Sequence, residues 1–414
     1  MSDFIFAAQQ GRKIPKEDKN FAVNNRAKAM IAEKGKDAVV NATIGVLLDE
    51  EGKLVVLSSV DEVFKTLSGA EFAEYAPIGG IPGFKDAVLK DTFGSYSPKS
   101  HTRVVATPGG TGALHSAIAN YSLPGDKVLL TDWYWGPYGT IAGEIGRSLH
   151  TFKLVDEQGK FNTADFEKQV MGLLEVQDRL VIILNTPAHN PTGYSLTLDE
   201  WESVASVLDQ IPEDKRVTLV VDVAYLDFAG EPEKYREFMP VLDSMGENVL
   251  PVIAYSFSKS FTLYGMRCGA MICMADNEEV AEEFRSVCEY SARAAWSNCN
   301  RAPQVMLSKI YSDPALLARV QEERAGFRDM LLRRGRAFEA AAKEVGLEIV
   351  PFDAGFFASV PCSQPDAAAA ELEKEGIFTI PLSMGIRVSI ASITEETCKR
   401  LPARIKAAIE ATEK

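Results

Sequence analysis

From Ile78 onward, short apolar runs alternate with glycine-containing loops and helix-like segments. The runs are near-continuous stretches of Val, Ile and Leu, and they lie at residues 103–106, 127–130, 180–184, 217–221 and 252–257. Strands of this composition are usually covered on both faces, which is typical of a parallel sheet between two layers of helices. The sequence therefore predicts an α/β fold built on a mostly parallel sheet.

Segments outside this repeat predict a second, smaller domain, since 414 residues are too many for one simple core. A helix is expected at about 21–33 and a short strand at about 54–57. A helix at 314–345 is unusually long to run without a break and could link two domains. Beyond it, the pattern predicts strands at 347–350, 356–360 and 387–390 and helices at 364–375 and 394–412.

We expect three parts along the chain. Residues 1–53 would form an N-terminal arm and part of the small domain. Residues 54–325 would form the large, cofactor-binding domain, and residues 326–414 the C-terminal small domain.

Composition excludes several classes of function. The net charge is −14 and no basic stripe is present, so we do not expect nucleic-acid binding. The six cysteines form no C-x-x-C pair and there are only four histidines, so no metal site is expected. The sequence shows no signal peptide and no apolar stretch long enough to span a membrane, so we expect a cytoplasmic protein.

Lys259 is the strongest candidate for a functional residue. It follows the apolar run 252–257 inside the motif Ser256-Phe257-Ser258-Lys259, and Arg267 lies shortly after it. A lysine amine can form a Schiff base with an aldehyde, and serine hydroxyls with an arginine can hold a phosphate dianion. A lone lysine here would more simply be an exposed side chain. The combination favours a site for pyridoxal 5'-phosphate (PLP).

Other polar residues follow neighbouring strands, and in an open α/β sheet ligands bind outside the carboxyl ends of the strands. Asp222 ends the run 217–221 and could keep a pyridine nitrogen protonated, or could simply cap a turn. Tyr225 could bond the ring's phenolic oxygen or pack in the core. Asn190 lies in the loop after 180–184.

A glycine-rich turn, Gly109-Gly110-Thr111-Gly112, follows the run 103–106 and opens a helix. Its backbone N–H groups could bind a phosphate, although such turns are common.

Together these segments resemble the class I aminotransferases of fold-type I, in the aspartate and aromatic aminotransferase group. The resemblance covers about residues 24–408. Its most specific parts are the Lys259 motif with Arg267, and Ala188-His189-Asn190-Pro191-Thr192-Gly193. The supporting motifs are Tyr75-Ala76-Pro77-Ile78-Gly79-Gly80, Gly110-Thr111-Gly112-Ala113-Leu114, Trp135-Gly136, Asp222-Val223-Ala224-Tyr225 and Gly385-Ile386-Arg387-Val388.

The resemblance implies a PLP-dependent aminotransferase that moves an amino group from an aromatic or acidic L-amino acid to 2-oxoglutarate by a ping-pong mechanism. It implies a mostly parallel seven-stranded sheet flanked by helices, a smaller α/β domain, and a homodimer with shared active sites.

The resemblance also implies roles for residues around the cofactor. Lys259 would hold PLP and then move the substrate proton. Asp222 would pair with the ring nitrogen, Asn190 and Tyr225 would contact the phenolic oxygen, and Trp135 would stack on the ring. The phosphate would be bound by Gly110, Thr111, Ser256, Ser258 and Arg267, joined by Tyr75 of the partner subunit.

For the substrate, the resemblance implies that Arg387 binds the α-carboxylate and that Trp135 and Asn190 also touch the substrate. Gly45 would lie in a loop that closes over it. Arg293 of the partner subunit would bind a distal carboxylate.

Three departures from the family pattern stand in the first half of the chain. Pro137-Tyr138 replaces the Asn and His common in aspartate-type members, Asp132-Trp133-Tyr134 lacks the frequent Asn-Pro, and Gly109 stands where Ser is frequent. The aromatic loop Trp133-Tyr134-Trp135 fits either simple packing or a roomier, more aromatic pocket.

Two alternative functions remain at this stage. A β-lyase or decarboxylase could use the same scaffold, although Arg387 and Arg293 favour transamination of a dicarboxylate. A non-catalytic PLP-binding regulator usually carries an added DNA-binding domain, for which this chain has no room.

Overall fold

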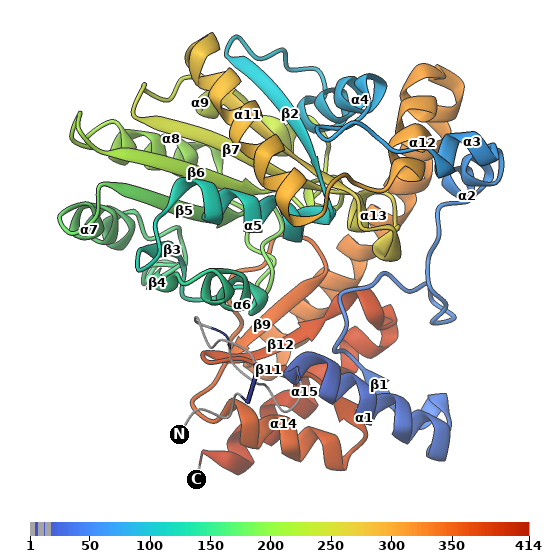
Figure 1. The fold of residues 1–414 in the computed structure, drawn as a ribbon. Helices are drawn as coiled ribbons and strands as arrows, with labels where there is room; N and C mark the ends of the chain where they lie inside the picture. The colour runs from blue at the N-terminus through green and yellow to red at the C-terminus, as the bar shows by residue number, and fades with distance from the viewer. Residues whose placement is uncertain (1–4, 7–11, 13–17, 414) are drawn as a thin grey trace.

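The computed structural model describes residues 5, 6, 12 and 18–413, and a seven-stranded sheet lies at the centre of its upper part (Figure 1). In sheet order the strands are β2 (His101–Thr107), β8 (Gly269–Ala275), β7 (Val249–Ser256), β6 (Arg216–Asp222), β5 (Arg179–Asn185), β3 (Lys127–Thr131) and β4 (Ser148–Phe152). All neighbours are parallel except at β8, which is antiparallel to β2 and β7. The predicted α/β architecture with a mostly parallel seven-stranded sheet is confirmed.

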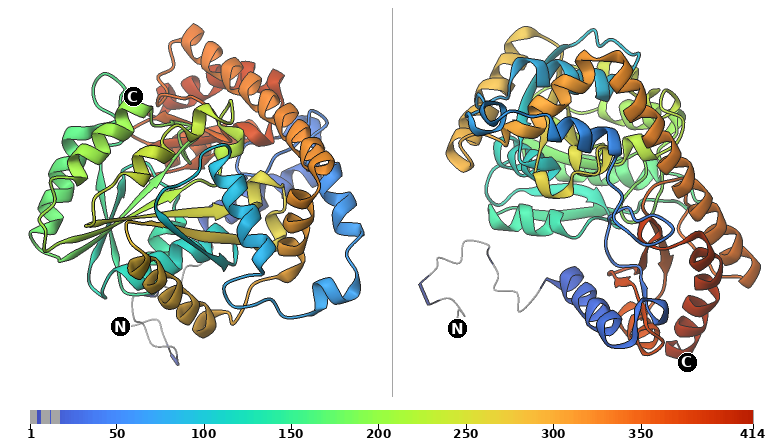
Figure 2. Two further views of the ribbon diagram at one scale, coloured as in Figure 1. Left: turned by 90° about the horizontal axis from the view of Figure 1, so that it is seen from above. Right: turned by 90° about the vertical axis from the view of Figure 1, so that its right-hand side faces the viewer.

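Helices cover both faces of this sheet (Figure 2). One face packs against α5 (Gly109–Tyr121), α6 (Pro137–Glu144) and α11 (Glu278–Ala295). The other packs against α4 (Pro82–Phe93), α7 (Thr163–Leu174), α8 (Leu198–Leu208), α9 (Met239–Asp243) and α12 (Arg301–Ser312).

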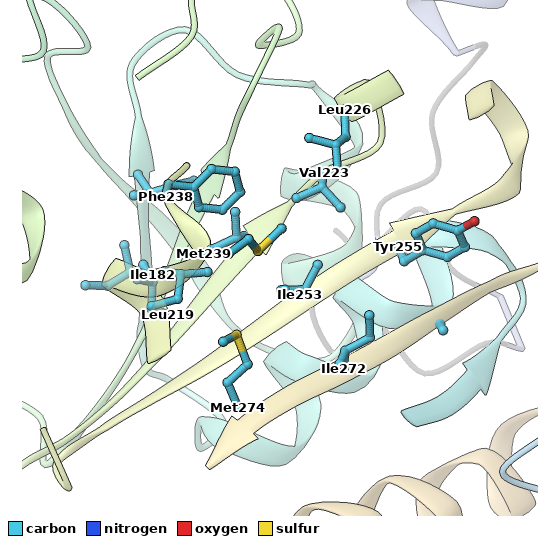
Figure 3. Packing of buried hydrophobic residues seen from close by; sticks show 14 of the residues in the cluster. Ile182, Leu219, Val223, Leu226, Phe238, Met239, Ile253, Tyr255, Ile272 and Met274 are labelled. Atoms are coloured by element: carbon cyan, nitrogen blue, oxygen red, sulfur yellow. The ribbon is translucent and has the colours of Figure 1, made fainter. Parts of the chain in front are cut away.

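Strand residues alternate between the two cores, as the pleat requires. Ile182, Leu219 and Ile253 belong to the second core, while Figure 3 shows the second core, where side chains of neighbouring strands share one side of the sheet with Phe238 and Met239. Burial of every such side chain on either face explains why these strands read as continuous apolar runs.

Two small sheets lie below the large one (Figure 1). One pairs β1 (Val40–Asn41) in parallel with β10 (Ile377–Phe378), and the other is antiparallel, with the order β11 (Ile380–Pro381), β12 (Gly385–Ser389) and β9 (Phe357–Pro361). Around them lie α1 (Lys19–Lys34), α14 (Pro365–Lys374) and α15 (Glu395–Thr412). The two ends of the chain thus meet in one region, while the exact domain boundaries stay a prediction.

The helix α13 (Pro314–Val345) has the bounds that the sequence predicts, and it is unbroken. Asp313 caps its start by accepting from two backbone N–H groups, Pro314 occupies the first turn, and Gly346 ends it in a left-handed conformation. It runs along one side of the molecule, from the upper part to the lower (Figure 2, right). Despite its length, neither it nor any other helix in the described ranges is apolar enough to cross a membrane.

Two predicted strands are wrong, and two real strands were not predicted. Residues 54–57 form only an isolated bridge from Leu54 to Leu48, before α2 (Ser58–Lys65) and α3 (Gly69–Ala73). Residues 347–350 follow the end of α13, and only Val350 N–H reaches β9, at Ser359. The strands β4 and β8 were missed because β4 is a half-exposed edge and β8 is rich in Gly, Ala and Met.

A buried ion-pair network ties α13 to the large sheet's loops. Arg324, on α13, donates to Asp91 at 3.1 Å and to Asp227 at 2.8 Å. Arg236 donates to Asp227 at 2.9 Å, and the hydroxyls of Tyr255 and Tyr311 donate to Asp91. Burial alone would raise the pKa of Asp227, but the charges of Arg324 and Arg236 outweigh it and lower that pKa.

Replacing Arg324 by Leu should destabilise the fold strongly, because two buried carboxylates then lose a charge partner. The expected loss is about 3–5 kcal/mol of unfolding free energy, measured by urea denaturation. The matched control is Arg319→Leu on the same helix, since Arg319 and its partner Glu62 are both exposed. Equal stability of the two variants would show that the network does not hold α13 in place.

Candidate active site

A cavity of about 200 Å³ lies at the carboxyl ends of β5, β6 and β7. The parallel register aligns Asn185 with Asp222 and Asp222 with Ala254, so the last residues of three strands face one space. All predicted cofactor contacts except Tyr75 line it, namely Gly110, Thr111, Trp135, Asn190, Asp222, Tyr225, Ser256, Ser258, Lys259 and Arg267. The fold therefore brings together residues that are up to about 150 positions apart in the sequence.

Lys259 lies in the single turn α10 (Phe257–Ser260), which begins directly after β7. Its Nζ donates to the Gly45 carbonyl and lies 4.7 Å from the Tyr264 ring centroid. Burial, reinforced by the charges of Arg387 and Arg267, lowers the pKa of Lys259 to about 7. The amine can therefore be uncharged near neutral pH, which both a nucleophile and a general base require.

Asp222 is buried, with 6% of its surface exposed. Its Oδ2 accepts from the Tyr138 hydroxyl at 2.7 Å and its Oδ1 accepts from Ala224 N–H at 3.2 Å. Burial raises the pKa of Asp222, and these two hydrogen bonds oppose that rise. Within the described residues neither donor is a cation, so the carboxylate is suited to a positively charged group in the cavity.

Asn190 and Tyr225 meet across the cavity. Asn190 Nδ2 donates to the Tyr225 hydroxyl at 3.2 Å. Asn185 holds this arrangement, because its Oδ1 accepts from Asn190 N–H at 2.7 Å and its Nδ2 donates to the Asp222 carbonyl at 2.8 Å. The predicted neighbours Asn190, Tyr225 and Asp222 are thus braced by a residue that the sequence analysis did not assign.

An anion-binding corner lies between the start of α5 and the Lys259 turn. Arg267 Nη1 donates to Ser258 Oγ at 3.0 Å. A Cβ on Gly109, which has a φ of +73°, would lie 2.4 Å from Arg267 Nη2. Serine therefore cannot replace Gly109 without moving this guanidinium, which explains one departure from the family pattern. The hydroxyls, the guanidinium and the backbone N–H groups that open α5 suit a phosphate.

Arg387, on β12, approaches the cavity from the small sheet. It is 5% exposed, and it donates to the Thr43 carbonyl at 2.8 Å and to Asn190 Oδ1 at 3.3 Å. Its buried Nε has no hydrogen-bond partner within the described structure. Burial lowers the pKa of Arg387 to about 10. A cation with a free N–H and no carboxylate beside it fits a ligand carboxylate.

The segment around Gly45 lies over Lys259. A Cβ at Gly45 would be 2.5 Å from Cζ of Phe357, so only glycine permits this approach. Leu47 N–H donates to the Tyr264 hydroxyl at 2.9 Å. The segment therefore rests on Lys259 and Tyr264, next to the cavity, as expected for Gly45.

The aromatic loop divides between core and cavity. Trp135 lines the cavity and meets the Tyr138 ring edge-on at a centroid distance of 5.4 Å. Trp133 belongs to one hydrophobic core and Tyr134 packs against the other. For Trp133 and Tyr134, simple packing is the interpretation that the structure supports.

Tyr75 and Arg293 are absent from the lining of this chain's own cavity in the described structure. Tyr75 is 84% exposed, and Arg293 is exposed near the end of α11, where it donates to Ser297 Oγ. Their predicted roles need a second subunit, and they stay predictions.

Three further lining residues were not assigned from the sequence: Tyr138, Asn185 and Tyr264. Asn185 ends a strand, as Asp222 does, so its position alone could have suggested it. Tyr138 stood out only as a departure from the family pattern, and Tyr264 only as part of the Arg267 motif.

Comparison with known proteins agrees with this geometry. The family described as "Aminotransferase class I and II" matches residues 37–405. An aspartate aminotransferase of Escherichia coli K12 is 30% identical over 315 residues, which cover 74% of this chain and 77% of that protein. A solved aminotransferase from Anaerococcus prevotii is 36% identical, with a TM-score of 0.95 over 98% of this chain and 100% of that one.

A more distant structure has the same fold. The aromatic-amino-acid aminotransferase of Burkholderia pseudomallei, solved covalently bound to pyridoxal phosphate, is 24% identical with a TM-score of 0.80 over 99% of this chain and 100% of that one. The family match spans nearly the whole chain and includes every motif that lines the cavity. This protein therefore belongs to the class I and II aminotransferases, in the aspartate and aromatic group.

Proposed function

We propose that this aminotransferase moves an amino group from an aromatic or acidic L-amino acid to 2-oxoglutarate, by a ping-pong mechanism. The observation that carries the proposal is the buried Arg387, whose unpartnered Nε lies beside a cavity that also contains Lys259. Every amino acid and every 2-oxo acid presents an α-carboxylate. One arginine can therefore bind both substrates in turn, as a ping-pong reaction requires.

The cofactor of the family is PLP, and the cavity suits it. The anion-binding corner around Arg267 and Ser258 would hold the phosphate. Asp222 would face the ring nitrogen, where a protonated ring supplies the cation that this carboxylate lacks. Asn190 and Tyr225 would face the phenolic oxygen, and Trp135 would cover the ring. When bound, PLP accepts the amino group and stabilises negative charge that develops on the substrate α-carbon.

Lys259 would hold the cofactor covalently and would later carry the proton of the substrate α-carbon. Its burial and the two nearby arginines keep its pKa about 7, so the free amine can accept that proton near neutral pH. The Gly45 carbonyl orients the amine, and the segment 45–47 covers it on the solvent side.

A dicarboxylate needs a second cation. In the described part of this chain the cavity lining contains Lys259 and Arg267, and Arg267 is engaged with Ser258 and Tyr264. We propose that Arg293 of the partner subunit binds the distal carboxylate and that Tyr75 of the partner subunit joins the phosphate site. A homodimer in the cytoplasm is part of this proposal.

The direct test is to incubate the enzyme with 2-oxoglutarate and a panel of L-amino acids, and to measure the glutamate and the 2-oxo acid formed. Aspartate or an aromatic amino acid should give equal amounts of both products. Release of ammonia or carbon dioxide without glutamate would instead identify a lyase or a decarboxylase.

Replacing Arg293 by Leu should separate the two classes of donor. Losing one partner of a closed Arg–carboxylate pair costs about 2–5 kcal/mol, so kcat/KM for aspartate and glutamate should fall by about 30-fold or more. Phenylalanine and tyrosine half-reactions should change little in single-turnover measurements. Arg285→Leu on the same helix is the control, because Arg285 pairs with Glu282 and Glu289 of that helix. Equal losses for both classes of donor would make Arg293 structural.

The low pKa of Lys259 predicts its reactivity in the cofactor-free protein. Acetic anhydride reacts with the uncharged amine, so the labelling rate of Lys259 should rise with pH around a midpoint near 7. Ordinary exposed lysines should show a midpoint of about 10.4. Mass spectrometry after labelling at a series of pH values gives both curves. A midpoint for Lys259 near that of the exposed lysines would contradict its assignment as the general base.

A further inference from the structure

Tyr138 is the buried polar side chain beside the cavity to which the proposed mechanism gives no role. It lies in the first turn of α6, directly after Pro137, and only 2% of it is exposed. Its ring packs in the hydrophobic core beneath α5 and α6, while its hydroxyl reaches the cavity and donates to Asp222 Oδ2 at 2.7 Å. One side chain thus joins the core to the carboxylate at the end of β6.

The bond is a fixed donation in one direction. An ionised carboxylate can only accept, so the phenol must supply the proton. Burial and the neighbouring Asp222 raise the pKa of Tyr138 well above its ordinary value, so the phenol stays protonated at any pH at which the protein is folded. A neutral donor that does not titrate adds no charge beside the carboxylate.

The same ring also contacts Trp135. The two rings meet edge-on, at 5.4 Å between centroids and 90° between planes. Trp135 would cover one face of the cofactor ring, and Asp222 would meet its nitrogen. The phenol therefore contacts two groups that together define where a flat aromatic ligand can lie.

We propose that Tyr138 is a positioning residue, whose hydroxyl holds the Asp222 carboxylate in the orientation that pairs with the pyridine nitrogen of the cofactor. The inference rests on the proposed function, because it takes Asp222 as the partner of that nitrogen. It goes beyond it by assigning the donor that aims the carboxylate. Tyr138 acts through Asp222 and does not touch the reacting atoms.

The test measures binding of 4'-deoxypyridoxine 5'-phosphate, which has the ring and the phosphate but no aldehyde, and so cannot bond to Lys259. Titration calorimetry on the cofactor-free, full-length protein gives Kd for wild type, Tyr138→Phe, Asp222→Ala and the double variant. Phenylalanine keeps the ring against Trp135 and removes only the hydroxyl. Tyr194→Phe is the matched control, because Tyr194 is a buried tyrosine that donates to Glu200 at 2.6 Å, away from the cavity lining.

Tyr138→Phe should raise Kd about tenfold when Asp222 is present and less than about twofold when it is Ala, since a hydrogen bond to a charged group is lost only in the first case. Tyr194→Phe should leave Kd unchanged. An equal rise in both backgrounds, or no rise in either, overturns the inference.

The same cycle distinguishes failure of the inference from failure of the proposed function. If Asp222→Ala raises Kd but Tyr138→Phe does not, only the inference about Tyr138 fails. If Asp222→Ala itself leaves Kd unchanged, the assignment of Asp222 fails and the inference fails with it.

Should Asp222→Ala not fold, the pH dependence of Kd in Tyr138→Phe decides. Without the phenol, the carboxylate loses a hydrogen bond that lowers its pKa, so binding should be lost at a higher pH on the acid side than in wild type. An unchanged acid limb overturns the inference, because a merely structural tyrosine would not move it.

Discussion

The parallel register of β5, β6 and β7 is the constraint on which the site depends. Hydrogen bonding pairs Asn185 with Asp222 and Asp222 with Ala254, and β7 then runs on to Ser256, next to Lys259. A slip of one residue would turn each of these side chains to the opposite face of the sheet. The two hydrophobic cores prevent such a slip, because alternate residues of each strand belong to different cores.

Charge inside the cavity differs in sign from the charge of the whole chain. The net charge is −14, yet Lys259, Arg267 and Arg387 all lie at or beside the cavity, where the described residues contribute one carboxylate, Asp222. Local cations therefore decide which ligands fit, and they favour a phosphate and a carboxylate. The same charges, together with burial, keep the pKa of Lys259 low, so anion binding and proton transfer have a common physical cause.

Sequence reasoning found the parts of the site that local pattern determines. Lys259 and Asp222 each follow a continuous apolar strand, and Arg267 belongs to the Lys259 motif, so their positions could be predicted. Tyr138 could not, because its bond to Asp222 joins residues 84 positions apart and leaves no local signal. Tyr75 and Arg293 depend on resemblance alone, since a single chain does not bring them to its own cavity.

The fold shows the same division. The bounds of α13 were predictable because Asp313, Pro314 and Gly346 mark them. The edge strand β4 lacked an apolar run, and the predicted strand at 347–350 failed because a local apolar pattern cannot show whether a partner strand is present.

The central claim is that Lys259 carries the cofactor. Borohydride reduction of the purified, cofactor-loaded enzyme, followed by digestion and mass spectrometry, should place the reduced pyridoxyl group on the peptide that contains Lys259. The Lys259→Ala protein should still bind PLP at the anion-binding corner, but it should give no labelled peptide and lose turnover by orders of magnitude. A label on another lysine of the wild-type enzyme, or normal turnover by Lys259→Ala, would contradict the account.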